Sequence, residues 1–115
     1  MPKPEKKLPA SFYQSPNGTE PVRAWLRRLP PRDRGTIGLD ISTIEYQWPV
    51  GMPLCRALGD GLWEVRSNIS DGRIARVIFV VVDGRMVLLH GFVKKTGKTP
   101  DRGRRLAVRR KKEIE

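Results

Sequence analysis

The sequence predicts an α+β domain in which a small antiparallel or mixed β-sheet is packed by two N-terminal helices and followed by a basic C-terminal helix. Apolar residues recur at helical spacing up to about residue 48. Between residues 62 and 92, apolar and β-branched runs alternate with short turn sequences, which is typical of neighbouring strands. With 115 residues, the chain has room for one core, so we expect a single domain over 1–115, with 1–7 flexible.

Two helices are expected in the first half, after an edge strand over residues 8–13. Thr19 resembles an N-cap, and one helical face follows it: Val22, Trp25, Leu26 and Leu29. Pro30 and Pro31 end this helix and begin a second one. The second helix carries its own apolar stripe: Ile37, Ile41, Ile44 and Trp48. Two antiparallel helices joined by so short a turn can cover one face of a sheet.

The strands come next in the sequence. They are expected over residues 62–68, 73–82 and 85–92, with a brief strand near 56–58. Asp83 and Gly84 separate two apolar runs, and both central residues of a type I′ turn need positive φ. This pair therefore predicts a β-hairpin.

The hairpin fixes which residues face each other. If Val82 pairs with Arg85, Arg76 lies opposite Gly91, which leaves space for a ligand above the guanidinium. In the same register, His90 points to the opposite side of the sheet. We therefore expect His90 to be a hydrogen-bonded core histidine.

Positive charge is concentrated near the C-terminus. Lys and Arg number 23 against 12 Asp and Glu, for a net charge of +11, and residues 94–112 hold ten cations against the single carboxylate of Asp101. Such a field attracts phosphates, although it would also attract an acidic protein or an anionic membrane. Alternatively, the charges belong to a helix that is merely solvated and binds no partner. The concentration of charge and the neighbouring sheet favour a nucleic-acid partner. Thr99 as cap and Pro100 at the first position predict that this helix runs to about residue 114, with only a thin apolar contact.

The sequence lacks the residues that several classes of function require. Cys55 is the one cysteine, which excludes an intramolecular disulfide and a CxxC site and agrees with a reducing, cytoplasmic location. The longest apolar run is too short to span a bilayer, so we expect no membrane partner. One histidine cannot supply two imidazoles as acid and base. The carboxylates are scattered, so we expect no metal site and no cofactor.

Fixed cations remain as candidates for catalysis. Cleavage of RNA by its own 2′-hydroxyl requires alignment of that oxygen with phosphorus, stabilisation of the phosphorane charge, and proton transfer. Arginine can clamp a phosphate with two parallel hydrogen bonds, and lysine supplies a compact charge. We assign catalysis to Arg66, Arg76, Lys94 and Lys95. We assign RNA binding to the cations that follow them: Lys98, Arg102, Arg104, Arg105 and Arg109. The alternative for Arg66 is a surface ion pair with Glu64.

Three segments in this order closely resemble the phage-related, Gp49-like branch of HigB toxins in the RelE superfamily. They cover residues 61–66, 75–79 and 89–100, and the last, with a lysine pair followed by Lys-Thr-Pro, is the most specific. The resemblance implies a RelE-like fold and a ribosome-dependent mRNA endonuclease, or mRNA interferase. It implies as partners the ribosome, mRNA and a cognate antitoxin, often a HigA-like helix-turn-helix protein. The family often has an aromatic residue where Ala75 stands and Gln where Gly97 stands.

Two other functions stay open from the sequence. The chain could be a non-catalytic basic module that docks on RNA or DNA. It could also be a degraded toxin that is kept for its antitoxin-binding surface.

Overall fold

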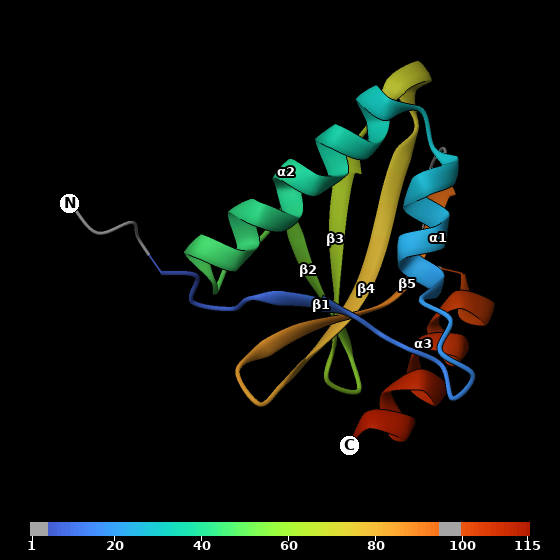
Figure 1. Ribbon diagram of the computed structural model, residues 1–115. Helices are drawn as coiled ribbons and strands as arrows, with labels where there is room; N and C mark the ends of the chain where they lie inside the picture. Colours follow the sequence, from blue (N-terminus) through green and yellow to red (C-terminus); the bar gives the residue numbers. More distant parts are fainter. Residues whose placement is uncertain (1–4, 95–99) are drawn as a thin grey trace.

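The computed structural model describes residues 5–94 and 100–115. A five-stranded sheet with the order β1-β5-β4-β3-β2 lies at its centre (Figure 1). The edge strand β1 (Ala10–Phe12) runs parallel to β5 (Arg85–Lys94). The remaining pairs are antiparallel and involve β2 (Cys55–Gly59), β3 (Leu62–Asn68) and β4 (Ile74–Val82). The predicted α+β class with a mixed sheet is therefore confirmed.

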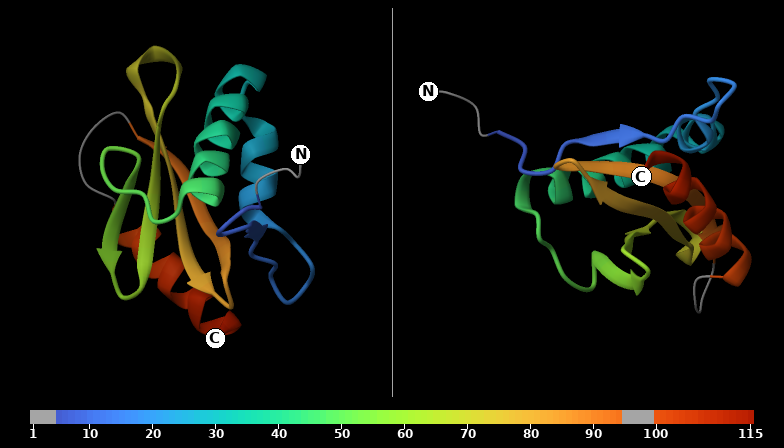
Figure 2. Two further views of the ribbon diagram at one scale, coloured as in Figure 1. Left: turned by 90° about the vertical axis from the view of Figure 1, so that its left-hand side faces the viewer. Right: turned by 90° about the horizontal axis from the view of Figure 1, so that it is seen from below.

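The helices lie on both faces of the sheet. Helices α1 (Pro21–Arg28) and α2 (Pro31–Gln47) cover one face, and α3 (Asp101–Ile114) covers part of the other (Figure 2). The cap of α1 is Glu20, with Pro21 in the first turn, so the predicted cap at Thr19 is wrong by one residue. The predicted cap of α3 at Thr99, like the expected flexibility of residues 1–4, lies outside the described residues. A short 3₁₀ turn, η1 (Ser70–Gly72), joins β3 to β4.

Two apolar clusters hold these layers together. Between the sheet and the N-terminal helices, the predicted stripe of α2 is buried against alternate residues of β4, including Val77 and Phe79. Beneath α3, the other residues of β4, including Ile78 and Val80, pack against Ala107. Since successive side chains of a strand point to opposite faces, β4 is apolar almost throughout because both of its faces are covered.

The β4–β5 hairpin begins as the sequence predicts. Val82 pairs with Arg85, and the ladder continues to Phe79 opposite Leu88. The register then shifts, because Leu89 is an extra residue on β5. A β-bulge of this kind places two residues of one strand opposite one of its partner. Beyond it, every predicted pairing is displaced by one residue.

The bulge overturns the predicted placement of the histidine. Ile78 pairs with His90 and Arg76 with Phe92, so His90 lies on the same face as Arg76 rather than on the opposite one. Gly91 pairs with Val77 on the other face, and the predicted pairing of Gly91 with Arg76 is wrong.

The space beside Gly91 serves packing rather than a ligand. A Cβ atom at this position would lie 2.4 Å from Cε3 of Trp25. The glycine therefore allows the indole of α1 to lie directly against β5, which seats this helix on the sheet.

Polar contacts add to the apolar attachment of α3. Nη1 of Arg110 donates to the carbonyl oxygen of Leu89 at 2.6 Å, and its guanidinium lies 5.3 Å from the ring centre of Tyr13. The Tyr13 hydroxyl in turn donates to Glu113. The basic helix is therefore held more firmly than its apolar residues predict.

Candidate nucleic-acid interface

Three arginines and one carboxylate lie together on the face of the sheet that carries α3. Arg56 of β2 pairs with Glu64 of β3, and Arg66 of β3 pairs with Arg76 of β4. Residues paired across antiparallel strands point to the same face, and so do residues two apart on one strand. Glu64 also pairs with Ile78, which packs beneath α3. We call Arg56, Glu64, Arg66 and Arg76 the arginine cluster.

A buried ion pair forms the centre of the arginine cluster. Nη1 of Arg76 lies 3.6 Å from Oε1 of Glu64, and both side chains are 0% exposed. Burial lowers the pKa of Arg76, the charge of Glu64 raises it, and the charges of Arg66 and Arg56 lower it. The guanidinium nevertheless stays protonated, because its ordinary pKa is so high. Arg76 thus contributes positive charge from inside the protein and has no contact with solvent.

Arg66 is the half-buried arginine of the cluster. Its backbone N–H donates to the carbonyl oxygen of Leu54 at 2.8 Å, and the residue borders a cavity of about 310 Å³ with Asp40 and Asn68. Its Nε atom is buried and has no hydrogen-bond partner among the described residues. Since nearly all buried N–H groups in proteins are hydrogen-bonded, an anion such as phosphate would suit this donor.

Strand β5 adds three side chains to the same face. His90, Phe92 and Lys94 alternate along the strand beyond the bulge, and all three are partly buried. Lys94 thereby lies on the same face as the arginine cluster. The other predicted cations of this region, Lys95 and Lys98, lie outside the described residues.

His90 is in a setting that favours its neutral form. Burial lowers the pKa of the imidazole, and the nearby charge of Arg110 lowers it further. The ring stacks on Phe92, with 5.5 Å between ring centres and 25° between the planes. A neutral imidazole at pH 7 can accept a proton.

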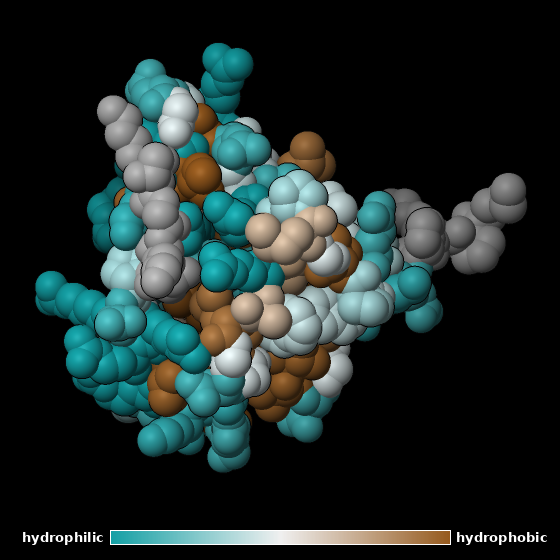
Figure 3. All heavy atoms as spheres, turned by 180° about the vertical axis from the view of Figure 1, so that it is seen from behind, coloured by the Kyte–Doolittle hydropathy of each residue, from teal (hydrophilic) through white to brown (hydrophobic). Residues whose placement is uncertain are grey.

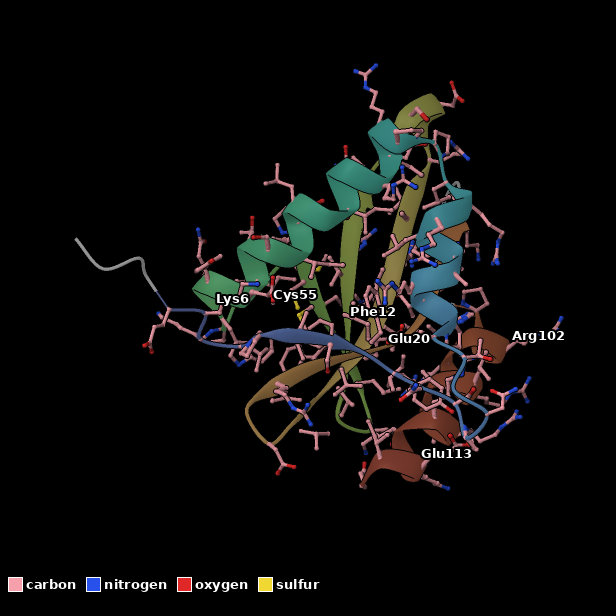
Figure 4. The ribbon with its side chains drawn as sticks, viewed as in Figure 1. Lys6, Phe12, Glu20, Cys55, Arg102 and Glu113 are labelled. Carbon is pink, nitrogen blue, oxygen red and sulfur yellow. The ribbon has the colours of Figure 1, made fainter. Side chains whose placement is uncertain are left out.

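The arginines of α3 that were predicted to bind RNA divide into two groups. Arg102, Arg105 and Arg109 are exposed and follow one side of the helix at spacings of three and four residues. Arg102 extends outward from the first turn (Figure 4), and hydrophilic side chains gather along this helix (Figure 3). Arg104 instead pairs with Asp60 of the β2–β3 turn, with 3.3 Å between Nη2 and Oδ2. Exposed pairs of this kind contribute little to stability.

The sequence-based assignment missed Arg56, His90 and Phe92. Arg56 belongs to an expected strand, but its place beside Glu64 depends on how β2 pairs with β3. The two residues of β5 were missed because nothing in the apolar run signals the bulge. Ala75, where the sequence departs from the family pattern described above, is buried in the core beneath the N-terminal helices. That difference therefore concerns core packing rather than this surface.

A comparison with known protein families shows to which family the chain belongs. The family described as Phage derived protein Gp49-like matches residues 24–112, which include the arginine cluster and most of α3. The chain belongs to the Gp49-like family. This family is part of the RelE/HigB-type toxin group, so membership indicates a toxin of a toxin–antitoxin system with a cognate antitoxin as partner. A comparison with curated proteins found no match.

Two further properties of the Gp49-like chain concern metals and membranes. Within residues 5–94 and 100–115, no three His, Cys, Asp or Glu side chains come together in a way that could hold a metal ion. In the same part of the chain, no helix combines the length and the hydropathy that a membrane crossing requires.

Proposed function

We propose that this Gp49-like protein is the toxin of a type II toxin–antitoxin system and acts in the cytoplasm as a ribosome-dependent mRNA endonuclease. The observation that carries the proposal is the charge of the arginine cluster, where Arg56, Arg66 and Arg76 surround the single carboxylate of Glu64. Three guanidinium groups against one carboxylate leave excess positive charge held by neighbouring strands. Charge fixed in advance stabilises a phosphorane without reorganisation when the reaction occurs.

The cations take different roles in this proposal. Arg66 and Lys94 are the proposed phosphate ligands, because both are partly exposed on the same face. Arg76 is a positioning residue, since its buried guanidinium holds Glu64 and adds to the local field without touching the substrate. Lys95 keeps a proposed catalytic role and Lys98 a proposed role in RNA binding, both on the sequence alone.

His90 is the proposed acceptor of the 2′-hydroxyl proton. As the 2′-oxygen forms its bond to phosphorus, the bond from phosphorus to the 5′-oxygen breaks, leaving a 2′,3′-cyclic phosphate and a 5′-hydroxyl end. The proton of the 2′-hydroxyl passes to the neutral imidazole, and the departing 5′-oxygen must receive another proton. Because the chain holds one histidine, the second proton comes from a group of the ribosome or from water.

Induced expression followed by mapping of mRNA 5′ ends tests the proposal. New ends should appear within translated messages and be absent from the same messages after loss of their start codon. Growth should stop on induction and should recover when the cognate antitoxin is also expressed.

Arg66→Ala should lower the cleavage rate about a hundredfold, as expected for loss of one charged group that stabilises the transition state by about 3 kcal/mol. Arg85→Ala, which removes an exposed arginine at the far end of β5, is the matched control.

A non-catalytic RNA-binding role is the second candidate. The exposed side of α3, with Arg102, Arg105 and Arg109, could dock on ribosomal RNA without any chemistry at the buried cluster. Growth arrest and ribosome association without new mRNA 5′ ends would favour this alternative.

A further inference from the structure

A cavity of about 470 Å³ lies between β5 and the start of α3. Its volume falls within the range of about 300–1,000 Å³ that small-molecule sites occupy. Six of its lining residues carry the argument: His90, Phe92 and Lys94 from β5, and Arg102, Gly103 and Leu106 from α3.

The β5 wall of the cavity is aromatic. The rings of His90 and Phe92 are stacked, with 5.5 Å between their centres. Gly103 stands opposite them on α3, and a Cβ atom there would lie 3.2 Å from Cδ2 and 3.3 Å from Nε2 of His90. The glycine thus lets the helix approach the ring pair without pressing on it.

Two cations accompany this aromatic wall. Lys94 lines the cavity at the end of β5, and Arg102 lines it from the first turn of α3. A flat apolar surface suits a nucleobase, because every base has a π-face that stacks on aromatic side chains. Cations beside that surface suit the phosphate of the same nucleotide. An apolar side chain of a protein partner would use the rings but would leave the two cations without a function.

We propose that this cavity binds one unstacked nucleobase of the RNA, with its phosphate held by Lys94 and Arg102. The inference rests on the proposed function, and it adds the contact by which the RNA is positioned beside the arginine cluster. His90 and Phe92 lie on the face that carries the cluster, so a base held here places the sugar–phosphate backbone next to Arg66. Stacking tolerates different bases, so the cavity orients the RNA more than it selects a sequence.

Proton NMR of the full-length protein tests the cavity directly. The chain has one histidine, so its imidazole proton signals belong to His90. Adenosine 5′-monophosphate should shift these signals in a saturable way, because a stacked base adds its own ring current. Ribose 5-phosphate, which has the phosphate but no base, should shift them much less. Equal shifts would reveal an anion site only, and no shift with either probe would likewise overturn the proposal.

Matched variants locate the binding. Phe92→Leu should weaken binding of adenosine 5′-monophosphate about tenfold, since it removes an aromatic partner and keeps an apolar side chain. Phe12→Leu makes the same change on the neighbouring strand β1, where Phe12 packs against the cluster beneath the N-terminal helices, and should leave binding unchanged. Melting curves show whether both variants are folded. Equal binding by the two folded variants would overturn the assignment.

Failure of this inference can be distinguished from failure of the proposed function. Nucleotide binding by a protein that generates no mRNA 5′ ends would refute the nuclease and leave the cavity assignment intact. Cleavage by a protein whose His90 signals do not shift with nucleotides would support the nuclease and refute the cavity assignment. If nucleotides fail to bind and purified antitoxin shifts the His90 signals, the cavity is a protein-docking site and the inference is wrong.

Discussion

The guanidinium of Arg76 is fully buried, and Glu64 makes that burial tolerable. Removing two charges from water costs several kcal/mol for each ion, so such a pair contributes little net stability even at the 3.6 Å separation seen here. Removal of one partner is a different matter, because the remaining charge stays buried. The sequence predicts the two strands that carry Glu64 and Arg76 but not their pairing. Arg66 stands two residues from Glu64 and is an equally plausible partner for it from spacing alone.

Glu64→Gln tests the importance of the buried charge. The substitution keeps the shape of the side chain and removes its charge, so the free energy of unfolding should fall by about 3–5 kcal/mol. A double variant with Glu64→Met and Arg76→Met should recover most of that loss, because no charge then remains buried. Urea denaturation measures both effects. Equal stability of Glu64→Gln and the unmodified protein would show that Arg76 does not depend on this carboxylate.

The pH dependence of cleavage tests the role of His90. Burial and the charge of Arg110 lower the pKa of this imidazole below its ordinary value of about 6.5. As a proton acceptor, the imidazole is active when neutral, so the single-turnover rate should be constant from about pH 8 to about pH 6.5. At lower pH it should fall, reaching tenfold per pH unit once the imidazole is protonated. A rate controlled by a pKa above about 6.5 would contradict this role.

At the level of elements, the sequence predicts most of the fold. The strand limits of β3 and β4 agree to within one residue of the prediction, because turn residues bound them clearly. The bulge at Leu89 could not be predicted, since the four consecutive apolar residues before His90 carry no alternation that would fix the register. That single extra residue decides whether His90 points to the core or to the candidate site.

Helix α3 is predicted to supply the salt-dependent part of RNA binding. Replacing Arg102, Arg105 and Arg109 by Gln should weaken binding to ribosomes and reduce the salt slope by about two, at about 0.7 for each phosphate contact with single-stranded RNA. The helix should stay attached, because its contacts through Arg110 and Tyr13 remain. Filter binding over a salt series measures the slope.

A matched control separates this surface from net charge. Replacing three exposed arginines elsewhere, Arg27, Arg28 and Arg85, removes the same charge without changing α3. Equal slopes for the two triple variants would show that α3 has no specific role.

Across the whole molecule, α2 fixes the sheet at two distant points. Near its start, Asp33 accepts hydrogen bonds from the backbone N–H and hydroxyl of Ser70 at the β3–β4 turn. Near its end, Glu45 accepts a hydrogen bond from the N–H of Ala10 on β1, at 2.7 Å, and pairs with Lys6. The second contact also occupies an N–H of an edge strand, which would otherwise be open to pairing with another chain.

The attachment of the helices to one face of the sheet explains why the candidate site lies on the other face. The N-terminal helices bury one face of the sheet and hold the strands in register. The arginine cluster can then occupy the other face, with its cations fixed by the strands rather than by mobile loops. In the proposed mechanism this scaffold supplies charge and alignment, and its one histidine supplies only half of the proton transfer.

Cleavage should therefore depend on the ribosome. Alignment of a nucleophile in a bound complex is worth several orders of magnitude in rate, and a ribosome that holds the mRNA in its decoding site can add both alignment and a proton donor. We expect purified protein to cleave an mRNA on programmed ribosomes at least about a hundredfold faster than the same RNA free in solution. Arg66→Ala should lower the rate on ribosomes about a hundredfold, because it removes a charge that stabilises the transition state. Rapid, codon-independent cleavage of free RNA at matched concentration would show that the chain carries a complete acid and base of its own.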